Sequence, residues 1–280
     1  MSIGNLILPT VFQPRNDAVS GLFRRASSFL RADPDFIIAG VQKGGTTSLF
    51  SWISKHPQFR PPFKKEINFF NSSEREKGIS YYRSYFTPKF MQFGGKITGE
   101  ATPNYFDHSS VALDIYHQYP SLKVIVLLRN PVERAWSHYR MSFGKGFENR
   151  TFYDALSLEE ERIEAVNNSQ MDRWKKNLVY ERLGYKSKGY YAPKLKIWVE
   201  LFGIENVFVI NSDEMFRSPL PVFNNVCRFL KIEENSVNDF TKINEGISFP
   251  KDDNSMEFLY KWFSPKNQEL KKLTGVNFQW

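Results

Sequence analysis

The sequence predicts an α/β fold: a mainly parallel sheet with a P-loop-like phosphate-binding turn, flanked by helices in a single domain. Residues 36–40, 124–128 and 206–210 are short apolar runs, typical of strands buried on both faces of a parallel sheet. Each run is followed by apolar residues at helical spacing. Because strands alternate with helices, a ligand is expected at the carboxyl ends of the strands.

The 280 residues suffice for one large domain, which we expect to span residues 35–280, preceded by an N-terminal extension over residues 1–34. Within the extension, residues 18–31 have the pattern of a basic amphipathic helix. We expect this helix to dock on its own domain, with peripheral contact to a membrane surface as the alternative.

The composition and net charge indicate which classes of binding partner and which cellular location to expect. The net charge of +8 favours anionic partners, but Lys and Arg are spread along the chain, so nucleic acid is not expected. The apolar stretch at residues 3–12 is interrupted by Pro9 and has no basic region before it, unlike a secretory signal. No stretch approaches the ~20 apolar residues of a membrane span. With a single cysteine, Cys227, expected as a buried thiol, these features predict a cytoplasmic protein.

The loop after the first strand, residues 40–47, is a modified phosphate-binding loop. Gly40 and Gly45 have the spacing of the glycines in G-x-x-x-x-G-K-[ST], and Thr47 stands at its Ser/Thr position. Thr46 replaces the lysine of that motif, and a lysine, Lys43, lies inside the loop instead.

This loop can still bind an anion. Gly44 and Gly45 let the backbone approach an anion closely, and the helix that begins near Thr46 adds its positive end. We expect Lys43 to reach a bridging oxygen and the Thr46 and Thr47 hydroxyls to donate to terminal oxygens. A plain glycine-rich turn is the less favoured alternative, because strand, loop and helix occur in the right order.

The second strand ends in a cation. Mg-dependent NTPases commonly have an Asp at the end of a neighbouring strand, whereas Arg129 stands here. Its guanidinium suits a phosphate monoester. Pro131 fits the first turn of the next helix, and Ser137, two turns in, is a candidate second donor.

Three further helices complete the prediction. Residues 152–166 read as an acidic amphipathic helix with an exposed acidic face. Helices over residues 191–202 and 222–230 flank the third strand.

Taken together, the motifs resemble those of sulfotransferases that use 3′-phosphoadenosine-5′-phosphosulfate (PAPS), and most of all the heparan sulfate sulfotransferase type. The likeness extends from about residue 35 to about residue 230 and rests on five segments in order. The segments are Lys43-Gly44-Gly45-Thr46-Thr47, Lys65-Glu66-Ile67-Asn68-Phe69-Phe70, Gly99-Glu100-Ala101-Thr102-Pro103-Asn104-Tyr105, Arg129-Asn130-Pro131 through Ser137, and Ser187-Lys188-Gly189-Tyr190-Tyr191.

The resemblance implies roles for these residues. The first segment would bind the 5′-phosphosulfate, and Arg129 with Ser137 the 3′-phosphate. Glu66 would be the catalytic base and Lys43 would stabilise the leaving group. Other roles implied are contacts to the nucleotide end of the cofactor (Lys188, Gly189, Tyr190) and to the acceptor (Glu100, Tyr105).

Two departures from the family pattern concern the C-terminal region and the acceptor. Residues 244–254 lack the Lys-Gly-Arg loop and cysteine pair of the heparan type, so Lys251 or a shorter, bacterial-like lid would have to close the site. Ala101 replaces a lysine near the acceptor. Both weaken the expectation of a heparan-like acceptor and leave the cofactor prediction intact.

The expected activity is sulfuryl transfer from PAPS to a hydroxyl or amine of an acceptor such as a glycan or glycolipid, without a metal. Two histidines, His56 and His108, are alternative bases, as in the small-molecule branch of the family. The rival functions are a Mg-dependent P-loop kinase or phosphotransferase and a non-catalytic module that binds anionic glycans.

Overall fold

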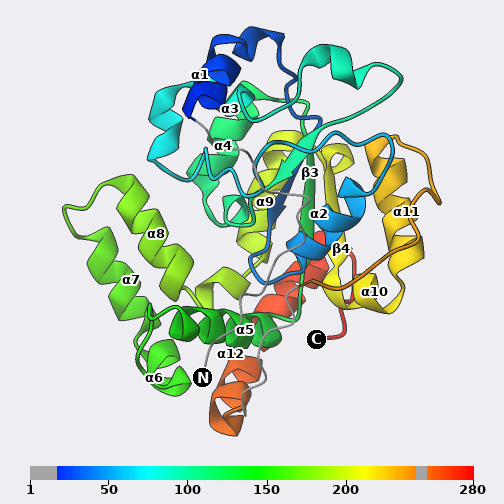
Figure 1. The fold of residues 1–280 in the computed structure, drawn as a ribbon. Coiled ribbons are helices and arrows are strands. Elements are labelled where there is room, and N and C mark those ends of the chain that lie inside the picture. The colour runs from blue at the N-terminus through cyan, green and yellow to red at the C-terminus, as the bar shows by residue number, and fades with distance from the viewer. Residues whose placement is uncertain (1–17, 244–250) are drawn as a thin grey trace, which may run out of the picture.

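A computed structural model describes residues 18–243 and 251–280, and its centre is a four-stranded parallel sheet covered by helices on both faces (Figure 1). The strand order is β2-β1-β3-β4, and every neighbouring pair is parallel. The strands are β1 (Phe36–Gly40), β2 (Gly99–Ala101), β3 (Lys123–Leu128) and β4 (Val207–Asn211). The predicted α/β fold is confirmed.

Helices connect and cover the strands. They are α1 (Ala18–Ala26), α2 (Thr46–Ser54), α3 (Ile79–Arg83), α4 (Ser109–Gln118), α5 (Pro131–Gly144), α6 (Phe152–Ser157), α7 (Glu159–Asn167), α8 (Arg173–Leu183), α9 (Ala192–Phe202), α10 (Ser212–Arg217), α11 (Pro219–Leu230) and α12 (Asp253–Thr274). Short 3-10 turns include η2 (Ser28–Leu30), η3 (Ser73–Lys77), η4 (Lys89–Gln92), η5 (Tyr105–Asp107) and η6 (Ser187–Gly189).

The strands separate two layers of core. Alternate residues of a strand point to opposite faces. In β1, Ile37 and Ala39 join the core that contains α4 and α9, whereas Phe36 and Ile38 join the core that contains α2 and α11. Both faces of the sheet are therefore buried, as the continuous apolar runs predicted.

A third, smaller core lies beside the sheet. Val132 and Trp136 of α5 pack with Phe152 of α6 and with Leu259 and Phe263 of α12. This core anchors α5, the helix that follows β3 (Figure 1).

Two predicted helices differ from the structure. The prediction of a single acidic helix over residues 152–166 is wrong, because α6 ends at Ser157 and α7 begins at Glu159. The Thr151 side chain caps the start of α6. The helix over residues 18–31 is also shorter, because α1 ends at Ala26 and a 3-10 turn follows. Part of the predicted N-terminal extension, residues 1–17, and residues 244–250 of the C-terminal loop lie outside the described residues.

Two sequence predictions about buried and membrane-spanning segments can be compared with the structure. Cys227 is a buried free thiol, as predicted, and burial raises its pKa to about 11. Within residues 18–243 and 251–280, no helix has both the length and the apolar character needed to span a bilayer.

Candidate functional site

The loop between β1 and α2 is built around two glycines. A Cβ on Gly44 would lie 2.8 Å from the backbone oxygen of Leu127, closer than real Cβ atoms come. Gly45 precedes α2 with φ +93°, a conformation that side chains disfavour. Ser212 at the start of α10 donates to the Gly44 carbonyl at 2.5 Å and fixes the loop from the β4 side. The sequence places glycine where only glycine fits.

Lys43 projects from this loop in a left-handed conformation, with φ +70°. Such conformations in residues other than glycine concentrate at functional sites. The first turn of α2, which begins at Thr46 and Thr47, directs unpaired N–H groups and the positive end of the helix dipole to the same place. Lysine, hydroxyls and helix terminus thus meet at one place, where we expect an anion to bind.

Arg129 lies against this loop, at the end of β3. Its Nη1 donates to the Lys43 carbonyl at 3.1 Å. Burial lowers the pKa of Arg129, but a guanidinium stays charged. Ser137 of α5 is buried and lines the same cleft. The structure therefore brings Arg129 and Ser137, the two predicted ligands of a 3′-phosphate, to the loop.

The site is strongly positive. Burial lowers the pKa of Lys43, and the charges of Arg129, Arg140 and Lys145 lower it further, while Glu66 opposes them. A cluster of like charges favours occupation by a polyanion, because the anion relieves their mutual repulsion.

Glu66 reaches the same cleft from the loop after residue 63. Its Oε1 lies 3.0 Å from Lys65 Nζ, and that Nζ also donates to Thr47 Oγ1 at 2.7 Å. The Glu66 side chain is 45% exposed, so its carboxylate is accessible to a ligand. Lys65 therefore links the predicted base to the phosphate-binding helix.

The loop that carries Glu66 is held from behind by Glu100. Glu100 is fully buried and accepts hydrogen bonds from Tyr105 Oη at 3.0 Å and from Thr102 Oγ1 at 2.6 Å. Those hydroxyls accept in turn from the backbone N–H groups of Phe69 and Asn68. Burial raises the pKa of Glu100, and the hydroxyl donors oppose that rise. Glu100 and Tyr105 therefore support the loop from the core, and the prediction that they face the acceptor is wrong.

These elements enclose a cleft of about 940 Å³. One part is lined by the predicted cofactor groups, and the other by polar residues from the 66–73 loop, residue 104 and α8. The lining includes Gln42, Lys43, Gly44, Gly45, Thr46, Thr47, Glu66, Asn68, Asn71, Ser72, Asn104, Arg129, Ser137, Lys145, Trp174, Glu181, Ser212, Asp213, Phe216 and Lys242.

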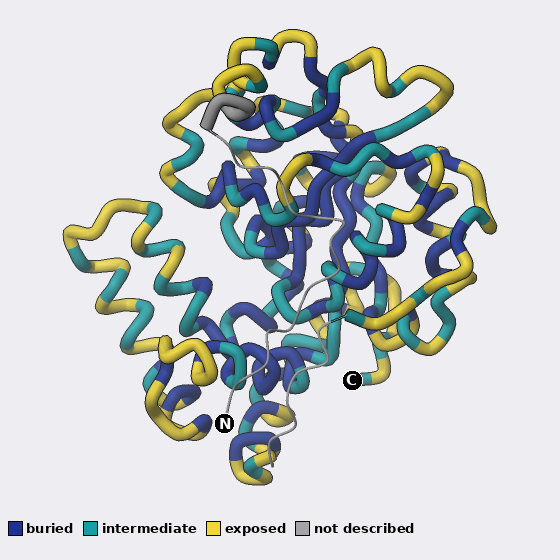
Figure 2. The backbone as a smooth tube through the Cα atoms, viewed as in Figure 1, coloured by how far each residue is buried: buried dark blue, intermediate teal, exposed yellow. Residues whose placement is uncertain are grey.

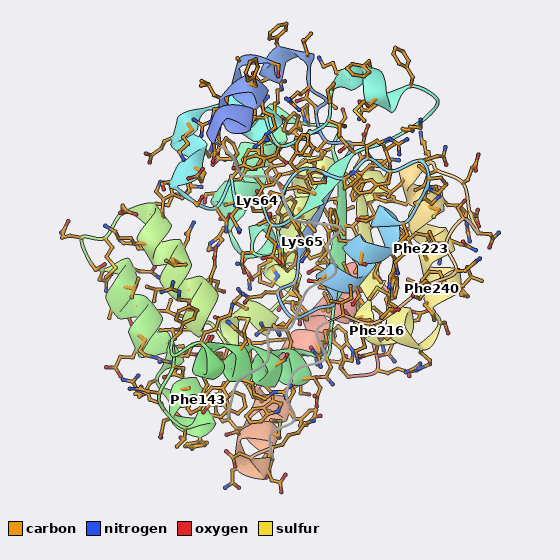
Figure 3. The ribbon with its side chains drawn as sticks, in the orientation of Figure 1. Lys64, Lys65, Phe143, Phe216, Phe223 and Phe240 are labelled. Carbon is orange, nitrogen blue, oxygen red and sulfur yellow. The ribbon has the colours of Figure 1, made fainter. Side chains whose placement is uncertain are left out.

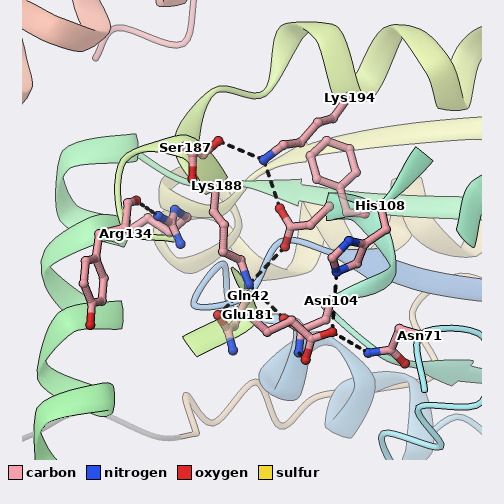
Figure 4. Close-up of polar contacts among 12 residues, drawn as sticks. Gln42, Asn71, Asn104, His108, Arg134, Glu181, Ser187, Lys188 and Lys194 are labelled. Carbon is pink, nitrogen blue, oxygen red and sulfur yellow. Dashed lines mark hydrogen bonds and ion pairs between the residues drawn. The ribbon is translucent and has the colours of Figure 1, made fainter. Parts of the chain in front are cut away.

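The second part of the cleft is organised by Glu181 of α8. Glu181 accepts from Asn71 Nδ2 at 2.8 Å and from Asn104 Nδ2 at 3.0 Å (Figure 4). Trp174, the second residue of α8, contributes an indole to the same wall. Amides, a carboxylate and an aromatic ring are suited to a hydroxylated ligand.

Lys188 lies behind this wall. Its Nζ contacts Asp107 at 3.1 Å, Gln42 at 2.8 Å and Asn104 at 3.0 Å, and its side chain is 1% exposed (Figure 4). Because Gln42 and Asn104 line the cleft, Lys188 positions cleft residues from inside the protein.

The two neighbours of Lys188 also point elsewhere. A Cβ on Gly189 would meet the Phe263 ring, and the Tyr190 hydroxyl donates to Glu269 of α12. None of Lys188, Gly189 and Tyr190 lines the described cleft, so the structure does not place them as direct cofactor ligands.

The alternative bases and the proposed substitute lysine are also engaged elsewhere. His56 is buried, with Nε2 2.8 Å from the Glu233 carbonyl, and His108 lies 3.5 Å from Glu181 behind the cleft wall. Lys251 pairs with Glu133.

Sequence reasoning missed Phe216 and Lys242. Phe216 lies on α10, the helix after β4, and lines the cofactor part of the cleft. Its ring packs edge-to-face on the Trp52 ring, with the two ring centres 6.1 Å apart. Lys242 lies 5.1 Å from the centre of the Phe216 ring. In Figure 3, Phe216 lies on the opposite side of α2 from Lys65. The rule that ligands bind at the carboxyl ends of parallel strands, applied to the third strand, could have found Phe216.

This chain is similar to known sulfotransferases in sequence and in fold. Residues 33–269 match the family described as the sulfotransferase domain. A solved structure of a sulfotransferase from Alicyclobacillus acidocaldarius has a TM-score of 0.68 and 30% identity, and the match covers 88% of this chain and 97% of that one.

Two curated relatives act on heparan sulfate according to their names. Human heparan sulfate glucosamine 3-O-sulfotransferase 5 is 29% identical over 273 residues, covering 88% of this chain and 74% of that protein. The bifunctional heparan sulfate N-deacetylase/N-sulfotransferase 1 of Caenorhabditis briggsae is 28% identical over 226 residues, covering 79% of this chain. The match spans only 25% of the length of the bifunctional protein. The resemblance predicted from the sequence is confirmed.

Proposed function

The chain belongs to the sulfotransferase domain family, and we propose that it transfers a sulfuryl group from PAPS to a hydroxyl or amine of a carbohydrate acceptor. The observation that carries this proposal is the meeting, in one cleft, of the Lys43 loop, Arg129, Ser137 and Glu66. The first three match the anionic ends of PAPS, and Glu66 supplies a carboxylate beside them.

The cofactor part of the cleft fits the chemistry of PAPS. Four cations line it, Lys43, Arg129, Lys145 and Lys242, together with the amino end of α2. The loop N–H groups and Lys43 would hold the 5′-phosphosulfate, and Arg129 with Ser137 the 3′-phosphate. Phe216 offers a ring face for the base.

The residues of the chain then have distinct roles in transfer. When bound, PAPS supplies a sulfuryl group whose bond to the bridging oxygen of the 5′-phosphate breaks as the bond to the acceptor atom forms. Glu66 takes the proton that the acceptor hydroxyl or amine loses. Lys43 stabilises the negative charge that develops on the bridging oxygen. Lys65 holds Glu66 and Thr47 in a fixed relation, which keeps base and donor site aligned.

A carbohydrate acceptor is supported by the second part of the cleft. Its amides and the Glu181 carboxylate can bind hydroxyl groups. The Trp174 ring offers an apolar face to the same ligand, while its N–H donates to Glu76. Two relatives carry names that specify heparan sulfate, also a carbohydrate. The cytoplasmic location and the absence of a metal requirement remain predictions from the sequence.

The test is calorimetric titration of the protein with adenosine 3′,5′-bisphosphate, the product that PAPS leaves behind, with ATP plus Mg²⁺ as the comparison ligand. We expect tight bisphosphate binding that is insensitive to EDTA. Arg129→Ala should weaken it by about 10-fold or more, the loss of one or two charge-assisted hydrogen bonds. Arg228→Ala is the matched control, since Arg228 is 61% exposed on α11 and does not line the cleft.

Two results would contradict the proposal. Mg²⁺-dependent ATP binding without bisphosphate binding would instead support a phosphotransferase. Bisphosphate binding without transfer of labelled sulfate from PAPS to any of a panel of glycans and glycosides would point to a binding module.

A further inference from the structure

The described part of the chain exposes its large apolar side chains unevenly. Seven of them are more than half exposed, and six lie on two segments, residues 22–30 and 90–93. The six are Leu22 (70%), Phe23 (73%), Phe29 (69%), Leu30 (55%), Phe90 (67%) and Phe93 (78%); the seventh is Ile204 (71%). We call these six side chains the N-terminal apolar patch. Contiguous exposed apolar groups mark an interaction surface.

The two segments are neighbours in space. Arg31 forms an antiparallel bridge with Pro88, and the Ala32 N–H donates to the Thr87 carbonyl at 2.9 Å. The Arg31 Nη1 also donates to the Phe86 carbonyl at 2.7 Å. These contacts join η2 and η4, and Figure 1 shows α1 and η4 at the same end of the molecule.

Basic residues predominate around the patch. Residues 18–32 and 84–97 contain no Asp or Glu but five cations: Arg24, Arg25, Arg31, Lys89 and Lys96. Of these, Arg31 is buried. The neighbouring carboxylates are already bonded, since Asp33 pairs with Arg83 and Asp35 accepts from Gln92 and from the Thr98 N–H. Arg24 lies over the Phe63 ring at 5.1 Å and Arg25 over the Tyr81 ring at 4.5 Å, which holds both near the patch. Lys89 is exposed beside Phe90.

We propose that the N-terminal apolar patch is a peripheral membrane-binding surface for bilayers that contain anionic phospholipid. Phenylalanine and leucine side chains insert shallowly at the boundary between headgroups and acyl chains, and nearby Lys and Arg attract anionic headgroups. Charge complementarity favours this occupant over a second copy of the chain, because two copies would bring the same cations together.

The patch lies at the opposite edge of the sheet from the cofactor site. Residues 31–35 lead into the amino end of β1, and residues 93–98 lead into the amino end of β2. The Lys43 loop follows the carboxyl end of β1, and parallel strands place all carboxyl ends at one edge. Figure 2 shows many exposed residues at the patch end of the molecule, whereas the strands are buried. The membrane proposal is therefore independent of the proposed activity.

The experiment is sedimentation of the full chain with vesicles of phosphatidylcholine alone or mixed with phosphatidylserine, at low and high salt. We expect binding to the mixed vesicles, weakened by salt. Phe23→Ser with Phe90→Ser and Phe93→Ser should lower the partition coefficient at least 10-fold. The matched control is Ile204→Ser, since Ile204 is equally exposed but lies outside the patch.

A second pair of variants tests the contribution of positive charge to vesicle binding. Lys89→Gln should lower binding to the mixed vesicles about fivefold, the effect of one basic residue near an anionic surface. The matched control, Lys271→Gln on an exposed site of α12, should leave binding unchanged. Circular dichroism and thermal unfolding serve as the check that each variant is folded.

Three outcomes would overturn the proposal. The first is no binding of the unaltered chain to either vesicle. The second is equal loss of binding in Ile204→Ser and the Phe variant. The third is a dimer in analytical ultracentrifugation that the Phe substitutions convert to monomer, without vesicle binding, because the patch would then join two copies.

Discussion

Tyr105 donates a hydrogen bond of 3.0 Å to Glu100 and accepts one of 3.0 Å from the backbone N–H of Phe69. It thereby connects a buried carboxylate to the loop that carries Glu66. The same carboxylate oxygen accepts from Tyr82 at 2.9 Å. The Tyr82 ring packs on Phe69 and Phe70 of that loop, but its hydroxyl donates to Glu100. Removing the hydroxyl of Tyr82 therefore weakens the support of Glu100 and keeps the ring contact with the loop.

Tyr105→Phe should therefore lower kcat about 10- to 100-fold, because a loosened loop misplaces the base. Bisphosphate affinity should not change. The unfolding free energy should fall by roughly 1–3 kcal/mol, the cost of leaving buried polar groups without a partner. Steady-state kinetics and urea unfolding measure the two effects. Tyr82→Phe should cause a similar loss of stability with kcat retained; equal kcat losses in both variants would show that Tyr105 acts only on stability.

Glu66→Gln should leave bisphosphate binding intact and lower kcat about 10²- to 10⁴-fold, the usual contribution of a general base. The readout is transfer of labelled sulfate from PAPS to the acceptor found in the glycan panel. Glu200→Gln, on the exposed side of α9, is the control for loss of one carboxylate. Retained turnover in Glu66→Gln would assign the proton transfer to another group.

The fold was predictable because its three longest strands are buried on both faces and therefore read as apolar runs. β2 has only three residues, Gly99–Ala101, and gives no such run. The acidic segment was read as one helix because a break at Leu158 leaves the charge pattern unchanged.

Part of the site could be predicted, because the backbone alone determines where its residues lie. Glycines, a helix start and a strand end place Lys43 and Arg129 without knowledge of side-chain direction. The predicted ligand contacts of Glu100 and Lys188 were wrong. Their motifs place both residues near the site but do not indicate whether the side chain points into the cleft or into the core. Both are buried ionisable side chains held by hydrogen bonds, which only the tertiary structure reveals.

The lowered pKa of Lys43 predicts that bisphosphate binding takes up protons at alkaline pH. A bound phosphate raises the pKa of Lys43, so affinity is greatest below the pKa of the free protein and falls as pH rises through it. Calorimetry in buffers of different ionisation enthalpy measures the uptake, above about pH 8, where the phosphates are fully ionised. Lys43→Met should abolish it and Lys242→Met should not. Equal uptake in Lys43→Met would assign the proton to another group.

Gly44→Ala should weaken bisphosphate binding and destabilise the chain by about 1–3 kcal/mol, because the new Cβ would meet the Leu127 backbone oxygen. Isothermal titration and thermal unfolding give the two values. Gly144→Ala, at the last residue of α5 with nothing within 4 Å of its Cβ position, should be neutral or slightly stabilising. Unchanged binding in Gly44→Ala would show that the loop has another conformation in solution.

Asp107→Asn should strongly destabilise the chain, because it removes the carboxylate between Lys188 and Lys194. Burial opposes ionisation of Asp107, but the two lysines and His108 outweigh it and lower its pKa. Breaking such a buried pair costs about 3–5 kcal/mol.

The pH dependence of that loss has a definite sign. Because the folded-state pKa of Asp107 lies below the unfolded value, its stabilisation is complete above about pH 4 and is lost as pH falls towards the folded-state value. Urea unfolding from neutral pH down to about pH 3 should therefore show a shallower acid dependence in Asp107→Asn than in the unaltered chain. Asp239 is the matched control: Lys55 lowers its pKa to about 2, but its side chain is 64% exposed, so Asp239→Asn should change stability little. An equal effect of the two substitutions would contradict a special role for the buried Asp107 cluster, whose Lys188 also holds Gln42 and Asn104 at the cleft.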